Sequence, residues 1–553
     1  MDFRIESGLV NFILIVFLSI SIIEVLDFLI KKDYSSLINN NQTYQSSIWC
    51  SGDNVDNRKC RAVNLCYQSN YRSWIFLNGP DSIESGLPEN PFGPGLISIS
   101  SLTGHNQFYL NYVVIDSQYF HQFSSKLEVR FVKDSTLIFG RFKPDNLMHL
   151  LHDDILPVKW TLNGLGWSKQ LVNFFLHDDW PHPKEIPGNY DLYKKLFNLN
   201  QLFTKSMDPN KLICFQEAHI GLDRETIWYQ YGFKVPQGAV PITENQKVNI
   251  GKLTNQLRSI LKPNECPKGG NGVFLSRTFN RLILNEDELI RSLSKNIKPV
   301  IKMNVNDNLV QLIERIYCSN LLIGIHGSSL ALSLFLPPGS SIVEIFPFGI
   351  NPDHYTPYKT LSSIRDLNYI SWVNHNLTNS IQHPEYSSSL GGINSLPDEI
   401  KSSIKDLNEQ LEPHLCCYDP NWLYRIYQDT IVDINQFNQL IVPKLRSHSE
   451  QSQSRRSPFY PGPVINIDCV YGEPFEFKLT WKKPWNIEFT DNQLINKLNY
   501  EILIDEGEGR GHSYIVTIES LSIPFNGKES FPLWIRCILN ERKGPFMIAN
   551  CSK

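Results

Sequence analysis

Two imidazoles and two carboxylates lie close together in the stretch NLMHLLHDDILP, residues 146–157. In a helix, His149, His152 and Asp153 fall at positions i, i+3 and i+4, which share one face. Such a group is typical of a general base with an orienting partner. The same three side chains could also ligate a metal ion. In a third, structural interpretation, Asp153 and Asp154 cap or solvate a helix whose leucines face the core. The spacing alone leaves all three open.

A second group of polar residues follows apolar runs that we expect to be neighbouring strands. Residues 324–329, GIHGSS, connect such a run to a helical pattern, and the free N–H groups of a helix start favour an anion. Open α/β sheets bind nucleotides at the carboxyl ends of their strands. The candidate nucleotide-binding residues are Ser276, Arg277, Asn280, Arg281, His326, Gly327, Ser328, Glu344, His354 and Tyr355.

Individual members of this second group suit individual parts of a nucleotide. The forked guanidinium of Arg277 matches a diphosphate. Glu344 stands in an apolar run, so its carboxylate needs a buried partner, and a ribose diol would serve. The glycine pattern is neither a Walker loop nor a complete G-x-G-x-x-G, and a tight turn between strand and helix explains Gly327 equally well.

Strands and helices alternate around the second group, which predicts parallel βαβ units in a doubly wound α/β sheet. The expected strands are residues 273–276, 300–303, 321–325 and 341–346, and the expected helices are 286–295, 309–318 and 328–336. Earlier, strands at 127–131 and 136–139 precede a loop and a helix within 141–166. Late in the chain, short runs at 475–481, 500–504, 514–518 and 533–539 predict an antiparallel sandwich.

The composition is that of a folded protein with several domains. At roughly 100–200 residues per domain, 553 residues suffice for about two to four domains. Hydrophobic residues make up 41% and aromatic residues 12%, which supports packed cores. The net charge of −4 argues against a large surface for phosphate backbones, so no nucleic acid partner is expected.

The N-terminus carries an apolar run. Residues 7–23 have no charge, and the apolar run continues, interrupted by Glu24 and Asp27, to residue 30 before two lysines. As a helix, residues 7–30 are long enough to span the ~30 Å hydrocarbon core of a bilayer. We expect a signal anchor rather than a cleaved signal peptide, since no small-residue cleavage site follows the run. We also prefer the anchor to a buried helix of a folded domain, because the run lies so close to the start of the sequence. The flanking charges do not set its orientation.

Cysteines and glycosylation triplets bear on the compartment. Cysteines form two groups in the sequence. Cys50, Cys60 and Cys66 follow the apolar run, and Cys469, Cys537 and Cys551 lie in the last part of the sequence. Neither group has zinc-site spacing, so disulfides in an oxidising compartment are expected. The total of 11 is odd, so at least one thiol is free or pairs outside the chain. Asn41, Asn376 and Asn550 fit the N-x-[ST] acceptor pattern.

Five longer strings make the chain recognisable: FGRFKPDNLMHLLHDDILP (139–157), WYQYGF (228–233), SRTFNRLILNE (276–286), FLPPGSSIVEIFPFGINPDHYTPYKTL (335–361) and HLCCYDPNWLYRIYQDTIVDI (414–434). With these strings the chain resembles glycosyltransferase family 61, from about residue 70 to its end. The resemblance implies a GT-B fold, with two Rossmann-like domains, and a terminal module similar to a fibronectin type III domain.

The resemblance also implies an activity. It is inverting transfer of N-acetylglucosamine from UDP-GlcNAc, in β-1,4 linkage, to O-linked mannose on glycoproteins of the α-dystroglycan type. The implied location is the endoplasmic reticulum membrane, as a single-pass type II protein with its catalytic part in the lumen. UDP-GlcNAc is then the donor substrate, and no obligatory cofactor or metal is expected.

For this reaction we expect Asp153 to be the base, with Asp154 and His152 as rivals and His149 as the orienting group. Arg277, Arg281 and the N–H groups after His326 would neutralise the leaving diphosphate. One departure concerns residues 326–329, where the family pattern of His-Gly-Ala followed by Gln is replaced by HGSS. Side-chain contacts at positions 328 and 329 are therefore not carried over.

Two alternatives remain open from the sequence. One is a family relative that modifies another acceptor, such as extracellular EGF-like domains, and the other is a catalytically silent glycan-binding membrane protein. The terminal module either guides acceptors or bridges the subunits of a homodimer.

The expected organisation has seven parts. They are a cytoplasmic tail (1–6), the anchor helix (7–30), a stem (31–70), an N-terminal Rossmann-like acceptor domain (71–245), a C-terminal Rossmann-like UDP-sugar domain (246–445), a linker (446–458) and the fibronectin type III-like domain (459–553).

Overall fold

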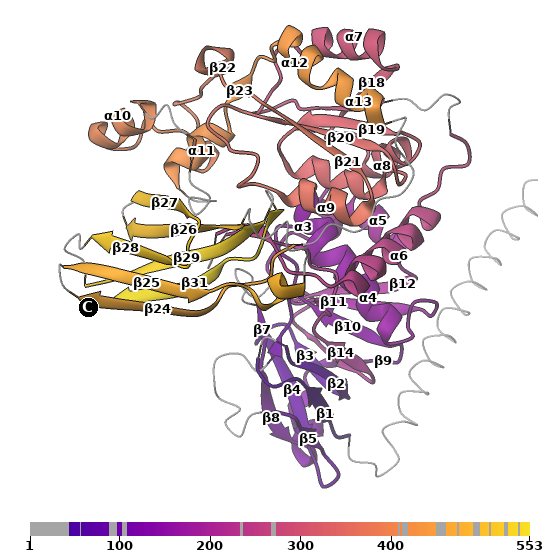
Figure 1. The fold of residues 1–553 in the computed structure, drawn as a ribbon. Coiled ribbons are helices and arrows are strands. Elements are labelled where there is room, and N and C mark those ends of the chain that lie inside the picture. Colours follow the sequence, from indigo (N-terminus) through magenta and orange to yellow (C-terminus); the bar gives the residue numbers. More distant parts are fainter. Residues whose placement is uncertain are drawn as a thin grey trace, which may run out of the picture.

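The computed structural model describes residues 44–55, 57–87, 97–101, 108–232, 236–266, 272–406, 410–411, 419–448, 460–472, 475–489, 498–507, 510–524, 529–539 and 542–553. These residues form two α/β halves and a C-terminal β-sandwich (Figure 1). The expected anchor at 7–30 lies outside the described residues, and so does the expected linker at 446–458 from residue 449 onward; residues 446–448 instead end helix α13 (Val442–His448). Within the described part, no helix has the length and apolar character needed to cross a membrane.

A seven-stranded mixed sheet forms one layer of the N-terminal half, in the order β12-β11-β10-β14-β2-β1-β5. Its strands are β1 (Ser47–Ser51), β2 (Lys59–Val63), β5 (Glu84–Ser85), β10 (Thr136–Phe139), β11 (Val172–Leu176), β12 (Leu199–Thr204) and β14 (Ala218–Ile220). The strands β12, β11, β10 and β14 are parallel, whereas β2 pairs antiparallel with both β14 and β1. This half therefore has a parallel centre with an antiparallel extension.

A second sheet in this half has the order β8-β4-β3-β13-β9. Its strands are β3 (Leu65–Gln68), β4 (Ser73–Asn78), β8 (Tyr112–Asp116), β9 (Glu128–Val132) and β13 (Lys211–Phe215). Consequently β1, β2 and β3 lie inside the segment 31–70, so the expected stem was wrong beyond Tyr44. The polar residues of this segment alternate with fully buried ones such as Ile48, Ala62 and Leu65, which belong to the core.

The C-terminal half contains a five-stranded parallel sheet in the order β18-β17-β19-β20-β21. Its strands are β17 (Gly272–Ser276), β18 (Val300–Asn304), β19 (Leu321–Ile325), β20 (Ser341–Phe346) and β21 (Asn368–Val373), and its helices include α7 (Glu286–Asn296), α8 (Leu309–Tyr317), η4 (Ser328–Phe335), α9 (Pro357–Arg365), α11 (Pro420–Ile426), α12 (Ile434–Leu440) and α13 (Val442–His448). The predicted doubly wound pattern is confirmed, although the helix expected at 328–336 is a 3₁₀ helix.

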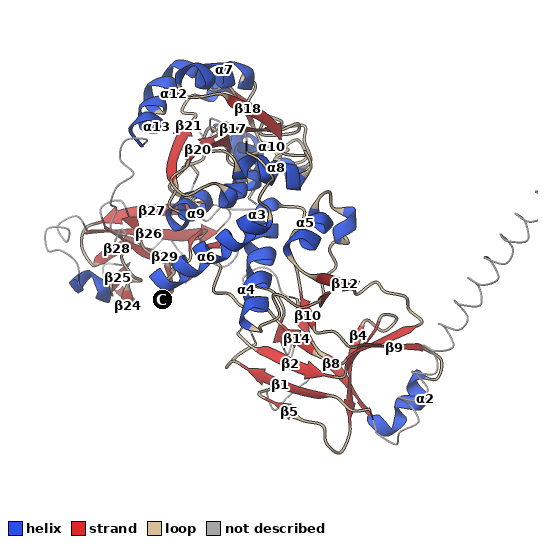
Figure 2. Cartoon of the chain, turned by 90° about the vertical axis from the view of Figure 1, so that its right-hand side faces the viewer, coloured by secondary structure: helices blue, strands red, loops and turns tan. Residues whose placement is uncertain are grey.

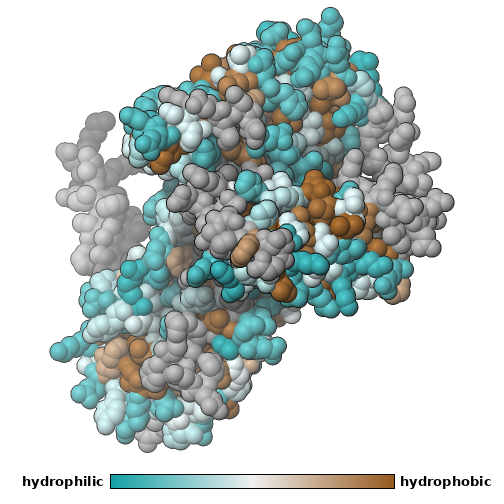
Figure 3. Space-filling model, turned by 60° about the vertical axis from the view of Figure 1, so that its left-hand side comes forward, coloured by the Kyte–Doolittle hydropathy of each residue, from teal (hydrophilic) through white to brown (hydrophobic). Residues whose placement is uncertain are grey.

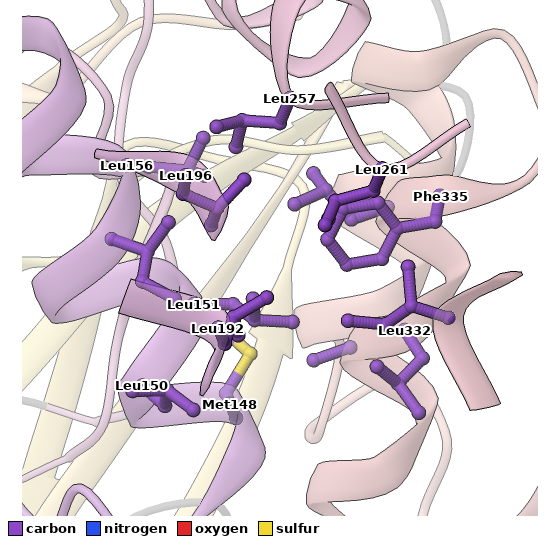
Figure 4. Close-up of a cluster of buried hydrophobic side chains, with 14 of the residues drawn as sticks. Met148, Leu150, Leu151, Leu156, Leu192, Leu196, Leu257, Leu261, Leu332 and Phe335 are labelled. Atoms are coloured by element: carbon purple, nitrogen blue, oxygen red, sulfur yellow. The ribbon is translucent and has the colours of Figure 1, made fainter. Parts of the chain in front are cut away.

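The two halves share one hydrophobic core. Helices α3 (Leu147–His149), α4 (Leu156–Gly164), α6 (Glu244–Ile260) and α9 lie between the sheets of the two halves (Figure 2). Side chains of the N-terminal half, including Leu151 and Leu192, belong to the same buried cluster as Leu261, Leu332 and Phe335 (Figure 4). The surface in Figure 3 is mainly hydrophilic, with hydrophobic side chains in scattered groups.

The C-terminal sandwich consists of two antiparallel sheets, ordered β24-β25-β28 and β27-β26-β29-β30, with β31 also paired to β29. The strands are β24 (Ile465–Gly472), β25 (Glu476–Lys482), β26 (Leu498–Gly507), β27 (Arg510–Val516), β28 (Ser520–Pro524), β29 (Ser530–Leu539), β30 (Arg542–Lys543) and β31 (Met547–Ser552). Alternate residues of these strands, with Trp481, form its core. The predicted antiparallel sandwich is confirmed.

Disulfides are present, as expected. In the part of the chain that the structure describes, the bonded pairs are Cys50–Cys60, Cys66–Cys214, Cys266–Cys318 and Cys469–Cys551. Cys66 thus pairs outside its sequence group, because β3 and β13 are neighbouring strands. Cys537 is a free and buried thiol.

Candidate active site

The histidine and aspartate residues lie on a continuous helical segment. It consists of α3, the π-helix η2 (Leu150–Ile155) and α4. Asn146 caps its start by accepting a 3.0 Å hydrogen bond from the N–H of Met148. Pro157 has no N–H for the carbonyl of Asp153 four residues earlier, and this carbonyl accepts instead from Ser101 Oγ at 2.5 Å. The missing helical bond accounts for the wider π turn, a feature frequent at functional sites.

Asp153 is the centre of a buried cluster and is 2% exposed. Its Oδ2 accepts from His149 Nδ1 at 2.7 Å, while its Oδ1 faces His152 Nδ1 and accepts from Tyr231 Oη at 3.2 Å. Burial raises the pKa of this carboxyl, but the imidazoles of His152 and His149 outweigh burial and hold the pKa below its usual range. Asp153 is therefore an ionised acceptor that three donors already engage.

His152 is fixed in one tautomer. Its Nε2 accepts the backbone N–H groups of Trp228 at 3.1 Å and Tyr229 at 3.3 Å, so this nitrogen carries no proton. The neutral ring then bears its proton on Nδ1, toward Asp153. Since both nitrogens are engaged and the residue is fully buried, His152 is placed to orient Asp153 rather than to receive a proton from a substrate.

His149 is the more accessible imidazole, with 10% of its side chain exposed. The rings of Phe142 and Tyr231 contact it edge-on, with centroids 4.7 and 4.5 Å away. Because Nδ1 donates to Asp153, Nε2 is the nitrogen that can take a proton, the arrangement that orients general bases in Ser-His-Asp enzymes. In the described part of the chain, no three His, Cys, Asp or Glu side chains are grouped to hold a metal ion.

Asp154 belongs to a separate, fully buried group with Arg141 and Asp178. Arg141 binds Asp178 in a bidentate manner, at 3.0 Å from Nε and 2.8 Å from Nη2. Among the described residues, no side chain hydrogen-bonds to Asp154. Burial and then the charge of Asp153 raise the pKa of Asp154 well above its usual value, and Arg141 offsets this only in part. Two adjacent carboxyls thus have opposite protonation preferences.

On the other half, Arg277 and Arg281 converge on Gly327. A Cβ atom at Gly327 would lie 3.3 Å from Nη1 of both arginines. Asn280 anchors Arg277 through its carbonyl and its side chain, at 3.1 and 2.9 Å, and Arg281 Nη1 donates to the carbonyl of His326 at 3.1 Å. Burial and then Arg281 lower the pKa of Arg277 to about 10, which means that an anion would relieve unfavourable charge.

The loop that carries these arginines is strained. Asn280 and Arg281 both have positive φ, 44° and 49°, which non-glycine residues adopt at a cost of about 1–3 kcal/mol. Strain of this kind collects at ligand-binding sites, where the surrounding contacts maintain it. The two arginines, His326 and Gly327, the start of η4 and the strained loop together form the donor-side cluster.

Glu344 has protein partners. Its Oε1 lies 2.5 Å from His326 Nδ1, its Oε2 accepts from Tyr369 Oη at 2.7 Å, and the residue is fully buried. The carboxylate therefore orients His326, whose ring also stacks on Phe346 with centroids 5.0 Å apart. The buried partner expected for Glu344 is thus supplied by the protein, and its contact with a ribose stays a prediction.

The remaining candidates are more scattered. Ser276 Oγ donates to Glu286 at 2.8 Å, and Ser328 is half-buried at the start of η4. His354 Nδ1 lies 3.3 Å from the carbonyl of Leu411, whereas Tyr355 is fully buried with its ring 6.3 Å from that of His326. As glycosylation acceptors, Asn376 and Asn550 are exposed, while Asn41 lies outside the described residues.

His149, His152, Asp153 and Tyr231 form the acceptor-side cluster, and one segment connects it to the loop at residues 354–358 of the other half. Trp228, whose N–H binds His152, also donates from its indole Nε1 to the carbonyl of Pro357 at 3.3 Å. Tyr229 Oη accepts from the N–H of Thr356 at 3.3 Å. Sequence reasoning gave Trp228, Tyr229 and Tyr231 no role. The run of aromatic residues with polar tips at 228–231 was the available signal.

Comparison with known proteins agrees with this geometry. Residues 147–343 match the model of the family described as Glycosyltransferase 61. Relatives named protein O-linked-mannose beta-1,4-N-acetylglucosaminyltransferase 2 align with nearly the whole chain. The relative from Takifugu rubripes is 33% identical over 93% of this chain and 90% of its own. Those from Bos taurus and Homo sapiens are each 34% identical over 90% of this chain and 87% of theirs.

Among solved structures, a fibronectin type III domain derived from a human protein is 17% identical to this chain. The match covers 16% of this chain and 72% of that domain, with a TM-score of 0.14. The family match and the names of the relatives show a glycosyltransferase, whose two α/β halves carry a base-like cluster on one and an arginine-lined helix start on the other. The chain belongs to glycosyltransferase family 61.

Proposed function

We propose that this enzyme transfers N-acetylglucosamine from UDP-GlcNAc to O-linked mannose on glycoproteins, forming a β-1,4 linkage with inversion at the anomeric carbon. The observation that carries the proposal is the extent of the alignment. Relatives whose names state this activity match at 33–34% identity over 90–93% of the chain, a span that includes both clusters.

On the donor side, Arg277 and Arg281 are proposed to bind the diphosphate of UDP above Gly327. Guanidinium groups suit phosphate oxygens because they present several N–H donors in a fixed fork. As the sugar leaves, negative charge develops on the diphosphate, and these two cations stabilise it. Both already converge at 3.3 Å from the Gly327 Cβ position, which supports this assignment. We expect no obligatory metal.

On the acceptor side, His149 and Asp153 are proposed to act together as the base. Asp153 was the first choice from the sequence, but its oxygens already accept three hydrogen bonds and its pKa is low. His149 Nε2 then takes the proton of the mannose hydroxyl while Asp153 stabilises the imidazolium. The hydroxyl oxygen forms a bond to the anomeric carbon, the bond from that carbon to UDP breaks, and UDP keeps the electron pair.

We further propose a GT-B fold for the two halves, a fibronectin type III-like identity for the sandwich, and a type II location in the endoplasmic reticulum membrane with residues 7–30 as anchor. The four disulfides among the described residues support a lumenal catalytic part, since disulfides form and persist in oxidising compartments. Guiding acceptors, or bridging the subunits of a homodimer, is the role proposed for the sandwich.

The deciding experiment offers the full-length protein UDP-GlcNAc with two acceptors, an O-mannosyl peptide and an EGF-like domain, and follows product by mass spectrometry. We expect one N-acetylglucosamine to be added to the mannosylated peptide and none to the same peptide without mannose. Modification of the EGF-like domain instead would identify a relative with another acceptor. Binding of UDP without any product would identify a silent glycan-binding protein.

A further inference from the structure

One face of the sandwich is buried although it lies outside the sandwich core. Along β26 and β29, Tyr500 and Ile535 face the core, so that Glu501 and Arg536 point to the opposite side of the sheet. Nevertheless, Glu501 and Arg536 are only 4% and 6% exposed. The catalytic part of the molecule covers this face, and the sandwich lies beside α9 in both ribbon views (Figures 1 and 2).

Glu501 lies between cations of the sandwich and a histidine of the C-terminal half. It pairs directly across the strands with Arg536, whose Nε donates to Oε2 at 2.5 Å, and Lys543 Nζ lies 3.7 Å from the same oxygen. Its Oε1 lies 3.7 Å from Nε2 of His354. Burial raises the pKa of Glu501, but His354, Arg536 and Lys543 hold it below its usual value, so the carboxylate is charged.

A buried ion pair seldom adds stability, because desolvation cancels much of the attraction. The contact with His354 indicates what this pair does instead. Next to His354 in the chain, Tyr355 is fully buried, and its ring lies 6.3 Å from that of His326 in the donor-side cluster. The ring of Tyr358 lies 6.0 Å from the same imidazole.

The same loop also reaches the acceptor-side cluster. The N–H of Thr356 donates to Tyr229 Oη, and the carbonyl of Pro357 accepts from the indole of Trp228. Trp228 and Tyr229 in turn bind His152 through their backbone N–H groups. Residues 354–358 therefore touch the donor-side cluster, the acceptor-side cluster and the sandwich within five positions.

We propose that Glu501 is a positioning residue for the transfer reaction: paired with Arg536, it holds His354 and thereby fixes the loop that joins the two substrate clusters. The inference rests on the proposed use of a UDP-sugar donor. Glu501 lies on the sandwich and acts on the reaction through His354, so the C-terminal module contributes to the active site without supplying a reacting group.

The test compares a single variant with a paired one, using the full-length protein and UDP as the probe in calorimetry. Glu501→Gln leaves Arg536 buried without its charge partner, so it disturbs both folding and positioning. Glu501→Leu with Arg536→Met replaces the pair by apolar side chains of similar size, which folded proteins usually tolerate. If positioning is the role, the folded paired variant still binds UDP about five- to tenfold more weakly, within the range typical of coupled sites.

Two further variants sharpen the result. His354→Gln should weaken UDP binding to a similar extent, and its combination with Glu501→Gln should be no worse than either single change, because both break one contact. Glu519→Gln is the matched control, since it removes a carboxylate that binds Tyr500 Oη at 2.8 Å within the sandwich. It should leave UDP affinity unchanged.

The outcomes separate this inference from the proposed function. Wild-type affinity in the folded paired variant would show that the pair serves only folding and would overturn the inference alone. Additive losses for His354 and Glu501 would overturn it in the same way. A wild-type protein that binds no UDP would overturn the proposed donor and this inference with it.

Discussion

At the scale of residues, the neighbouring carboxyls of Asp153 and Asp154 in the π-helix η2 have pKa values shifted in opposite directions by their surroundings. Asp153 has two imidazoles and a tyrosine hydroxyl as donors, whereas Asp154 is buried beside Asp153 with no side-chain donor among the described residues. Pairs of titratable groups whose environments push their pKa values apart are typical of acid–base sites. The two residues should therefore respond differently to the same substitution.

Asp153→Asn should lower kcat by about 10²- to 10⁴-fold, the range for loss of general base catalysis, while UDP affinity stays within about twofold. An amide at this position cannot stabilise the imidazolium of His149. Steady-state kinetics and UDP calorimetry check the expectation. Asp145→Asn, which changes an exposed carboxyl eight residues earlier, is the control. Near-normal turnover of Asp153→Asn would remove this residue from the mechanism.

Asp154→Asn should instead stabilise the protein at neutral pH. The pKa of Asp154 is raised on folding, so its carboxyl favours the folded state below its unfolded pKa, near 3.8, and this contribution is lost as pH rises through the folded pKa. Asparagine does not titrate, so the variant loses no stability as pH rises through this range. The melting temperature of the variant should exceed that of the wild type at pH 7, by about 1 °C per kcal/mol gained for a chain of this length, with a smaller difference at pH 4.

Asp179→Asn provides a control of opposite sign. Burial acts to raise the pKa of Asp179, but Lys205 and Arg72 outweigh it and lower this pKa. Its contribution is therefore present at neutral pH and is lost as pH falls through the folded pKa. This variant should melt below the wild type at pH 7 and approach it in acid. A melting difference for Asp154→Asn that does not change with pH would contradict the assignment.

The meeting of His149 and Asp153 could be predicted from their i, i+4 spacing. Their roles could not. The tautomer of His152 depends on N–H groups of Trp228 and Tyr229, which lie 76 and 77 positions later in the chain. Likewise, the partners of Glu344 are His326, directly after β19, and Tyr369 in β21, and a single sequence does not tell a protein partner from a ribose.

At the scale of elements, the turn between β19 and η4 leaves little room for an added side-chain atom. Gly327→Ala would place a Cβ 3.3 Å from both guanidinium groups, closer than such atoms normally pack. We expect UDP affinity to fall about tenfold, or about 1.4 kcal/mol, near the lower end for overpacking. Calorimetry measures the change. Gly251→Ala, in α6 with open space around the new Cβ, should leave affinity unchanged. Equal affinities for both variants would place the diphosphate elsewhere.

Elements buried on both faces were the easiest to predict. The bounds of β19 and β20 match the expected strands residue for residue. Parallel strands that are covered on both faces have sequences that are nearly continuous apolar runs, which makes their ends easy to find. By contrast, β1 and β2 were hidden in a polar segment, since they expose alternate residues and depend on β14 for burial. The sequence did not predict that η4 is a 3₁₀ helix, because its apolar pattern resembles that of an α-helix.

At the scale of the whole molecule, the three folded parts depend on one another through a few segments. The hydrophobic cluster joins the two halves, residues 228–231 connect the clusters, and Glu501 connects the sandwich to the loop before α9. The βα alternation and the late strands indicated the parts. Their mutual contacts required the structure, because contacts between domains leave no periodic pattern in the sequence.

The boundary of the folded catalytic part yields the last prediction. A chain beginning at Tyr44 keeps every described strand, whereas one beginning at residue 71, the expected end of the stem, loses β1, β2 and β3. β3 lies in the middle of its sheet between β4 and β13, and Cys66 bonds Cys214. Loss of such a disulfide alone typically costs about 2–5 kcal/mol.

We therefore expect residues 44–553 to be recovered without membranes, with a cooperative melting transition and wild-type affinity for UDP. Residues 71–553 should aggregate or melt without a cooperative transition, because removing β3 exposes the edges of two remaining strands and leaves Cys214 unpaired. Size-exclusion chromatography and thermal melting distinguish the two chains. If both fold with the same stability, residues 44–70 act as a stem after all; if residues 44–553 remain with the membrane, residues 7–30 are not the sole anchor.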